Sequence, residues 1–167
     1  MIRGNALASD DWTTIDDESG IPPEAEKLIV SLSRWCAEHE QLRSSGKLIG
    51  VRLPNIEDID AVFAEVADRP LLALEFPKFA DGRALTQARV LRGRLGYRGD
   101  LRGVGDILQD LIFIMRRCGF NEIVPRLGQD MDGCLRALAD FSTAYQPAAD
   151  GIRSAFVRRR SSQRTGI

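Results

Sequence analysis

The residues best placed to do chemistry fall within the segment 76–106, FPKFADGRALTQARVLRGRLGYRGDLRGVGD. It begins where an apolar run ends, passes through a loop that carries Lys78, Asp81 and Arg83, and ends in the glycine turn 103–106. Each charged stretch directly follows an apolar run of the kind that forms buried strands. Ligand sites of α/β proteins lie at the carboxyl ends of strands, so this segment is predicted to contribute two parts of one site.

The loop after the first apolar run predicts an anion site. Lys78 and Arg83 flank the start of an expected helix, whose unpaired N–H groups would add positive potential. Thr86 and Gln87 would supply polar contacts from its first turn. In the alternative interpretation, Asp81 and the glycine after it only turn the chain, and both cations are solvated.

The glycine turn is a second candidate, for a dinucleotide cofactor. Gly103 and Gly105 match part of the fingerprint Gly-x-Gly-x-x-Gly, but Leu108 stands where the third glycine belongs. Asp106 would also repel a phosphate, and its position favours a helix N-cap. We therefore predict no cofactor, with NAD(P) or flavin at Gly103, Gly105 and Asp106 as the weaker alternative.

Five arginines lie between Gln87 and Gly103, and they suggest either a docking stripe for an acidic protein or the solvated face of a helix. They are Arg89, Arg92, Arg94, Arg98 and Arg102. Only Tyr97 is interleaved with them, so nucleic acid is not an expected partner. Glu75 is expected to neutralise Arg102 across the sheet, and the alternative is that Glu75 and Asp106 pair as acid and base. The complete set of candidate ligand-binding residues is Lys78, Asp81, Arg83, Thr86, Gln87, Arg89, Arg102 and Asp106.

The composition excludes several classes of protein. The 167 residues are 44% hydrophobic and carry a formal net charge of −1, which suits one globular domain and gives no global attraction to nucleic acid or membranes. Cys36, Cys118 and Cys134 are far apart, which argues against a disulfide framework, a zinc ribbon or an iron–sulfur cluster. With His39 as the single histidine, no metal site is predicted, and catalytic residues stay unassigned.

The order of apolar patterns predicts an α/β fold. A helix is expected from Pro23, followed by strands that begin at Leu48, Leu71, Leu101 and Phe120, each with a helix after it. The last of these helices is expected over residues 131–145. Four consecutive βα units make a parallel sheet, and we favour a half-TIM-barrel over a small open sheet because the strands are short. Unpaired edges of such a half-barrel could be covered in a homodimer.

The chain is predicted to consist of an acidic flexible segment at residues 1–22, a single α/β domain at 23–147 and a basic tail at 148–167. No apolar run reaches the roughly 20 residues needed to cross a bilayer, and the amino terminus lacks the pattern of a secretory signal. A cytoplasmic location is therefore expected.

Over residues 49–145 the chain resembles a family of short bacterial proteins called domain of unknown function 934. The motifs that carry this resemblance are Gly50-Val51-x-Leu53, Leu74-Glu75-Phe76-Pro77-Lys78-Phe79, Asp81-Gly82-Arg83, Gln87-Ala88-Arg89-x-Leu91-Arg92, Gly96-Tyr97-x-Gly99, Arg102-x-Val104-Gly105-Asp106 and Arg117-Cys118-Gly119-Phe120. Thr86 stands where serine is the more frequent residue, and it keeps the hydroxyl.

The resemblance implies a role in assimilatory sulfate and sulfite reduction, the route to cysteine. Members are commonly encoded beside sulfite reductase and the phosphoadenylyl-sulfate reductase, and some carry the name of an oxidoreductase of sulfite reduction. The leading hypothesis is a non-redox accessory protein that docks to these enzymes or handles a small anion. The alternatives are a small NAD(P)- or flavin-dependent oxidoreductase of sulfite reduction and a structural half-barrel dimer that acts as a scaffold.

Overall fold

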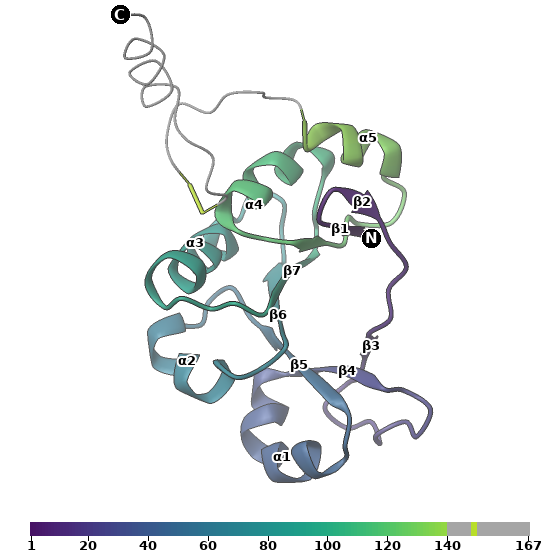
Figure 1. Ribbon diagram of the computed structural model, residues 1–167, viewed down its shortest axis with the longest axis vertical. Helices are drawn as coiled ribbons and strands as arrows, with labels where there is room; N and C mark the ends of the chain where they lie inside the picture. The colour runs from purple at the N-terminus through teal and green to yellow at the C-terminus, as the bar shows by residue number, and fades with distance from the viewer. Residues whose placement is uncertain (140–147, 150–167) are drawn as a thin grey trace, which may run out of the picture.

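A computed structural model describes residues 1–139 and 148–149 of the chain (Figure 1). Its strands are β1 (Ile2–Arg3), β2 (Ala6–Leu7), β3 (Thr13–Thr14), β4 (Lys27–Ser31), β5 (Leu48–Leu53), β6 (Leu71–Phe76), β7 (Asp100–Gly105) and β8 (Glu122–Ile123). Its helices are α1 (Leu32–Ser44), α2 (Ile59–Val66), α3 (Arg83–Arg89), the π-helical turn η1 (Val90–Arg94), the 3₁₀ turn η2 (Gln109–Leu111), α4 (Ile112–Cys118) and α5 (Met131–Ala137).

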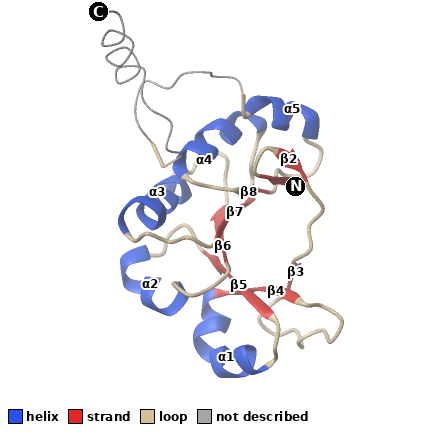
Figure 2. Cartoon of the chain, viewed as in Figure 1, coloured by secondary structure: helices blue, strands red, loops and turns tan. Residues whose placement is uncertain are grey.

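The strands form one curled, mostly parallel sheet with the order β2-β1-β8-β7-β6-β5-β4-β3. Strands β3 to β8 run parallel to their neighbours, and the β1–β2 hairpin adds to β8 in the antiparallel direction. The helices cover the convex outer face, as Figure 2 shows. The predicted α/β class is confirmed, and the sheet curls as a half-barrel.

The predicted helix from Pro23 is wrong in its first half, because Lys27–Ser31 is strand β4. It pairs in parallel with β5, so that α1 belongs to a fifth βα unit in front of the four predicted ones. Leu28 and Val30 face the helices, whereas Ile29 faces the inner side of the sheet. A strand buried on both faces reads as a continuous apolar run, which the sequence does not distinguish from a helix. The helix begins at Leu32, where the Ser31 hydroxyl accepts a hydrogen bond from the Arg34 amide at 3.0 Å.

The other predicted elements are present with shifted ends. The apolar residues that give them their helical spacing form one core between the sheet and the helices, which includes Val66, Leu91 and Met115. The predicted end of the last helix and the basic tail beyond residue 149 lie outside the described residues. None of the described helices is long and apolar enough to cross a lipid bilayer.

Residues 1–22, expected as a separate acidic segment, contribute β1, β2 and β3 to the sheet. Residues 8–12 connect the hairpin to β3 and run along the open side of the half-barrel; we call them the N-terminal strap (Figures 1 and 2). On the inner face, Trp12 of the strap packs against a small cluster of Ile29, Leu71 and Ala73. Gly50 makes this contact feasible, since a Cβ atom there would lie 3.2 Å from the Trp12 ring.

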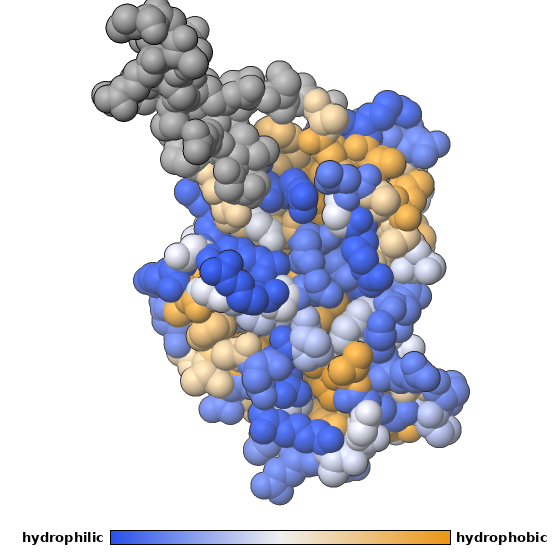
Figure 3. All heavy atoms as spheres, in the orientation of Figure 1, coloured by the Kyte–Doolittle hydropathy of each residue, from blue (hydrophilic) through white to orange (hydrophobic). Residues whose placement is uncertain are grey.

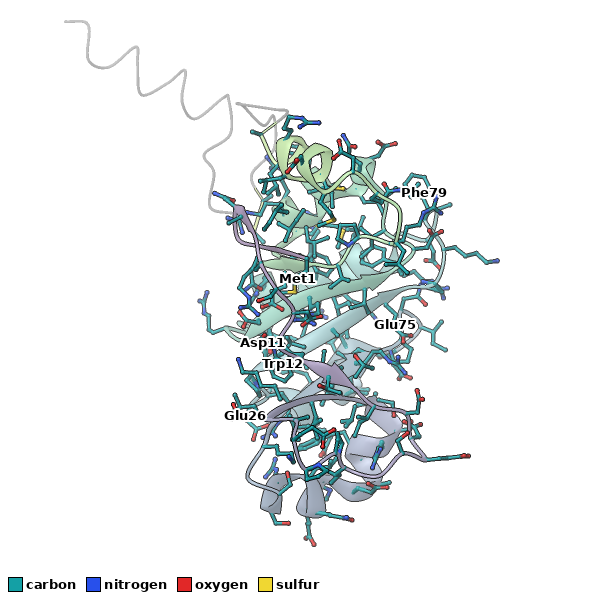
Figure 4. All side chains as sticks on the ribbon, turned by 90° about the vertical axis from the view of Figure 1, so that its right-hand side faces the viewer. Met1, Asp11, Trp12, Glu26, Glu75 and Phe79 are labelled. Atoms are coloured by element: carbon teal, nitrogen blue, oxygen red, sulfur yellow. The ribbon has the colours of Figure 1, made fainter. Side chains whose placement is uncertain are left out.

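Ion pairs hold the strap near the amino ends of the strands. Arg102 is 2% exposed and donates from Nε to Glu122 at 2.8 Å, while its Nη1 donates to Asp10 of the strap at 3.0 Å. Glu122 is completely buried, and its other oxygen accepts from Arg3 Nε at 2.7 Å. Figure 4 places Asp11 and Trp12 of the strap on one side of the molecule, with Glu75 and Phe79 on the other.

Replacing Glu122 by glutamine is expected to lower the free energy of unfolding by about 3–5 kcal/mol, because it leaves the buried Arg102 guanidinium with only the partly exposed Asp10 as a charged partner. Urea unfolding measures this loss. The control is Arg136→Gln, which removes an exposed ion pair with Asp130 and should cost at most about 1 kcal/mol. Equal losses in the two variants would contradict a structural role for the buried pair.

Asp11 should make stability depend on pH in acid. Hydrogen bonds from Lys27 and then Arg3 lower the pKa of Asp11 from its ordinary 3.8 to about 2. A carboxyl group with a lowered pKa stabilises the fold above its unfolded-state value, and this contribution is lost as the pH falls through about 2. The Asp11→Asn variant should therefore be less stable than wild type at neutral pH, and the difference should vanish between about pH 4 and pH 2. A difference that does not change with pH would contradict this role.

Candidate functional site

The predicted anion site after β6 is already occupied by a carboxylate of the chain itself. Asp81 accepts from the Arg83 amide at 3.2 Å and binds the Arg83 guanidinium through both oxygens, at 2.9 and 2.6 Å. The Arg83 guanidinium holds the pKa of Asp81 well below its usual range. Arg83 and the first turn of α3 are thus neutralised by Asp81. Lys78 is exposed and forms no ion pair with the described residues.

Asp106 connects two loops at the carboxyl ends of the strands. Its Oδ2 accepts from the Phe79 amide and its Oδ1 accepts from Arg126 Nη1, both at 3.0 Å. The predicted role of Asp106 as a helix N-cap is wrong, because the chain stays extended at Leu108 and the 3₁₀ turn begins one residue later. Asp106 instead fixes the loop after β6 to the loop after β8.

The two glycines of the turn are accounted for by packing. A Cβ atom at Gly103 would lie 2.1 Å from the Met115 side chain, so this position faces the helices. Gly105 has a φ of 110° and brings the chain so close to β6 that a Cβ atom would lie 2.4 Å from the Phe76 carbonyl oxygen. Both positions allow close approach within the fold, in place of the approach to a phosphate that the dinucleotide interpretation requires.

Two other candidates lie away from this end of the sheet. Arg102 is buried on the inner face near the amino ends of the strands, in the ion pairs described above. Glu75, expected to neutralise it, pairs with Arg52 of β5 at 3.0 Å. Arg89 is exposed on α3 and has no ion-pair partner among the residues described.

Three candidates come together in a groove between α2 and α3, at the carboxyl ends of β5 and β6. The groove has a volume of about 360 Å³. It is lined by Asn55, Ile56, Glu57, Asp58, Ile59, Asp60, Arg83, Thr86, Gln87, Val90 and Arg94. Asn55 and Gln87 are buried and form its floor, whereas Ile56 is 71% exposed at its rim. We call this site the α2–α3 groove.

The floor of the α2–α3 groove carries an unpaired donor and an unpaired acceptor. Gln87 Nε2 donates to the carbonyls of Pro54 at 2.9 Å and Glu57 at 3.1 Å, which fixes the direction of the amide. Its Oε1 and the Nδ2 group of Asn55 are buried and have no hydrogen-bond partner among the described residues. Arg83 is the main cause of the lowered pKa of Asp81, and the nearby Asn55 side chain adds to it. Each buried unpaired group costs about 1–3 kcal/mol, which a ligand can recover when the side chains above the floor move aside and let it reach these atoms.

The two arginines of the groove are paired within the chain, and Glu57 and Asp58 add two carboxylates to its lining. Arg94 forms an ion pair with Asp60 at one end, and Arg83 forms its pair with Asp81 at the other. Because both arginines have a carboxylate partner, the groove offers little net attraction to a free anion. What it offers is one donor, one acceptor and exposed apolar surface at Ile56.

The sequence prediction found Arg83, Thr86 and Gln87 of this groove but missed Asn55 and Ile56. Their position in the sequence could have identified them. Pro54 ends a strand, and the residues after it lie at the same edge of the sheet as the loop after β6. Polar loop residues of that kind are the ones that bind ligands in parallel α/β folds.

The fold and groove together define a small α/β half-barrel protein with its candidate site at the carboxyl ends of the parallel strands. The family described as "Bacterial protein of unknown function (DUF934)" matches residues 50–156. This range covers more than half of the chain, and the chain belongs to that family, as the sequence motifs predicted. All residues that line the groove fall within the match. No curated protein sequence matches the chain.

Replacing Asp106 by alanine should loosen the loop after β6, because the Phe79 amide loses its acceptor. A hydrogen bond to a charged group contributes about 1.5–3 kcal/mol, so the Phe79 amide should exchange with solvent at least about tenfold faster. Hydrogen exchange followed by NMR measures this, with the Arg83 amide as an internal control because it is bonded to Asp81. Faster exchange at both amides would indicate general unfolding instead.

Proposed function

We propose that this protein is a non-enzymatic accessory protein that docks to a partner enzyme by binding an exposed polypeptide segment in the α2–α3 groove. The observation that carries the proposal is the pair of unpaired polar atoms at the floor, Gln87 Oε1 and Asn55 Nδ2. A peptide unit presents one N–H and one C=O, which are the two groups that these atoms lack.

The surroundings of the floor favour a polypeptide over a small anion. Ile56 is exposed at the rim, where an apolar side chain of a partner can cover it. Arg83 and Arg94 keep their positions through ion pairs within the chain, so they can line the groove without needing a charged ligand. Rigid, pre-positioned side chains lower the entropic cost of association.

The groove is less suited to acid–base catalysis. Asp81, the carboxylate beside it, stays ionised far below neutral pH because of Arg83, and such a carboxylate is a weak base. Gln87 and Asn55 do not titrate. Of the carboxylates that line the groove, Asp58 caps α2 and Asp60 pairs with Arg94, so these side chains support recognition better than proton transfer.

For the identity of the partner, we propose sulfite reductase or a neighbouring enzyme of assimilatory sulfate reduction, because the family resemblance implies this pathway. The protein would then act on the pathway through contact with the enzyme, without a redox group of its own. A strain that lacks this protein should grow on sulfide or cysteine but not on sulfate or sulfite. That result would place its role at the reduction of sulfite.

The docking proposal is tested with the purified full chain and sulfite reductase, by affinity capture and then by titration calorimetry. Ile56→Lys should weaken binding at least about tenfold, because it places an unpaired charge in the apolar contact at the rim. The matched control is Leu48→Lys, which makes the same change at a side chain that is 50% exposed at the opposite end of the strands. Equal binding by the two variants, or failure of the wild-type protein to bind, would refute the proposal.

A further inference from the structure

A second cavity lies at the amino ends of the strands, on the side of the molecule opposite to the α2–α3 groove. It has a volume of about 350 Å³ and lies between the turn from η1 to β7 and the carboxyl end of α4. Its lining residues are Arg92, Arg98, Arg116, Gly119, Phe120 and Ala149. Figure 3 views this face and shows strongly hydrophilic side chains between the regions of α3 and α4. Three of the six lining residues are arginines.

Arg92 is built into the wall of this cavity. Its Nε donates to the Gly119 carbonyl at 3.0 Å, and its Nη1 donates to the carbonyls of Tyr97 and Gly99, both at 2.8 Å. Its Nη2 donates to Asn121 Oδ1 at 3.0 Å. These four bonds use four of the five N–H groups of the guanidinium, and one Nη2 proton is left for a further acceptor.

Gly119 leaves the space that Arg92 occupies. It has a φ of 105°, and a Cβ atom there would lie 2.4 Å from Arg92 Cγ, so another residue would displace the arginine. The local sequence thus holds a guanidinium in a fixed position at a cavity wall. Such pre-positioned arginines are suited to binding planar or tetrahedral oxyanions.

The positive charge of the cavity is not balanced by its own lining. Among its described lining residues there is no carboxylate, and within the described chain Arg98 and Arg116 form no ion pair. Burial lowers the pKa of Arg92. Tyr97 and Asp100 raise that pKa, whereas the nearby positive charge of Arg98 lowers it further. A bound anion would relieve the repulsion between the two arginines and supply an acceptor for the remaining Nη2 proton.

We infer that this cavity binds a tetrahedral oxyanion, a sulfate or phosphate group, which Arg98 and Arg116 contact from the rim while Arg92 supplies a fixed donor from the wall. Three guanidinium groups favour a doubly charged anion over a single carboxylate. The volume lies at the low end of the range for small-molecule sites, so there is room for an organic group attached to the anion. This site is separate from the proposed docking groove and does not depend on it.

The test is binding to the purified full chain of inorganic sulfate, inorganic phosphate and glycerol phosphate, each at constant ionic strength against chloride. We expect at least one of the three anions to bind saturably. NMR chemical-shift changes of the Gly119 and Arg98 amides measure this binding. Arg98→Gln and Arg116→Gln should each weaken it about tenfold. The matched control is Arg89→Gln, which removes an exposed arginine of α3 that does not line the cavity and should change nothing.

Both rim arginines lie at the surface of the cavity and are not part of the Arg92 hydrogen-bond cluster, so their variants should keep the wild-type melting temperature. Tighter binding of glycerol phosphate than of phosphate would indicate a ligand that carries the anion as a substituent; equal binding would indicate the free ion. Shifts that do not saturate, or that are equal in the Arg89, Arg98 and Arg116 variants, would overturn the proposal.

Discussion

The buried ion pair between Arg102 and Glu122 is the interaction on which the rest of the molecule depends. A half-barrel lacks the strands that would fill the inner face of a complete barrel, so another element has to cover that face. Here β7 and β8 direct a guanidinium and a carboxylate inward, and the guanidinium reaches Asp10 of the strap. The strap is thereby held where Trp12 can cover the inner apolar cluster.

The two ends of the strands differ in whether their arginines form ion pairs with acidic residues. At the carboxyl ends the arginines are matched by nearby acids, as in the pairs of Arg83 with Asp81 and Arg126 with Asp106. These two arginines therefore have little positive charge left for a ligand. At the amino ends, Arg98 and Arg116 stand without an acidic partner among the described residues, and positive charge stays exposed to a ligand. This difference between the two ends is not visible in the net charge of the whole chain, which is −1.

Much of the fold could be predicted from local patterns, because strand and helix periods are properties of neighbouring residues. The four strands that begin near Leu48, Leu71, Leu101 and Phe120 follow from short apolar runs with clear stops. Strand β4 could not be predicted, since the burial of its inner face depends on Trp12 of the strap, which is separated from it in the sequence. A continuous apolar run followed directly by a helix has no period that marks the boundary.

The candidate site was predictable in its location but not in its electrostatics. The rule that ligands bind at the carboxyl ends of strands directed attention to Arg83, Thr86 and Gln87, which line the α2–α3 groove. Whether a cation is free depends on its partner, and the partners of Arg102 are 20 and 92 residues away in the sequence. The run of five arginines illustrates this, because neighbours in that run have unrelated surroundings: Arg94 pairs with Asp60, whereas Arg92 binds carbonyl groups.

The π-helical turn η1 places one segment in both candidate sites. Val90 and Arg94 are four residues apart and lie on the side of the helix that lines the α2–α3 groove. Arg92, between them, points away from that side and reaches the carbonyls at the amino ends of β7 and β8. The Leu95 amide closes the wide turn by donating to the Val90 carbonyl at 3.0 Å. π turns are rare and are often found at functional sites, and this one directs neighbouring side chains to two different candidate sites.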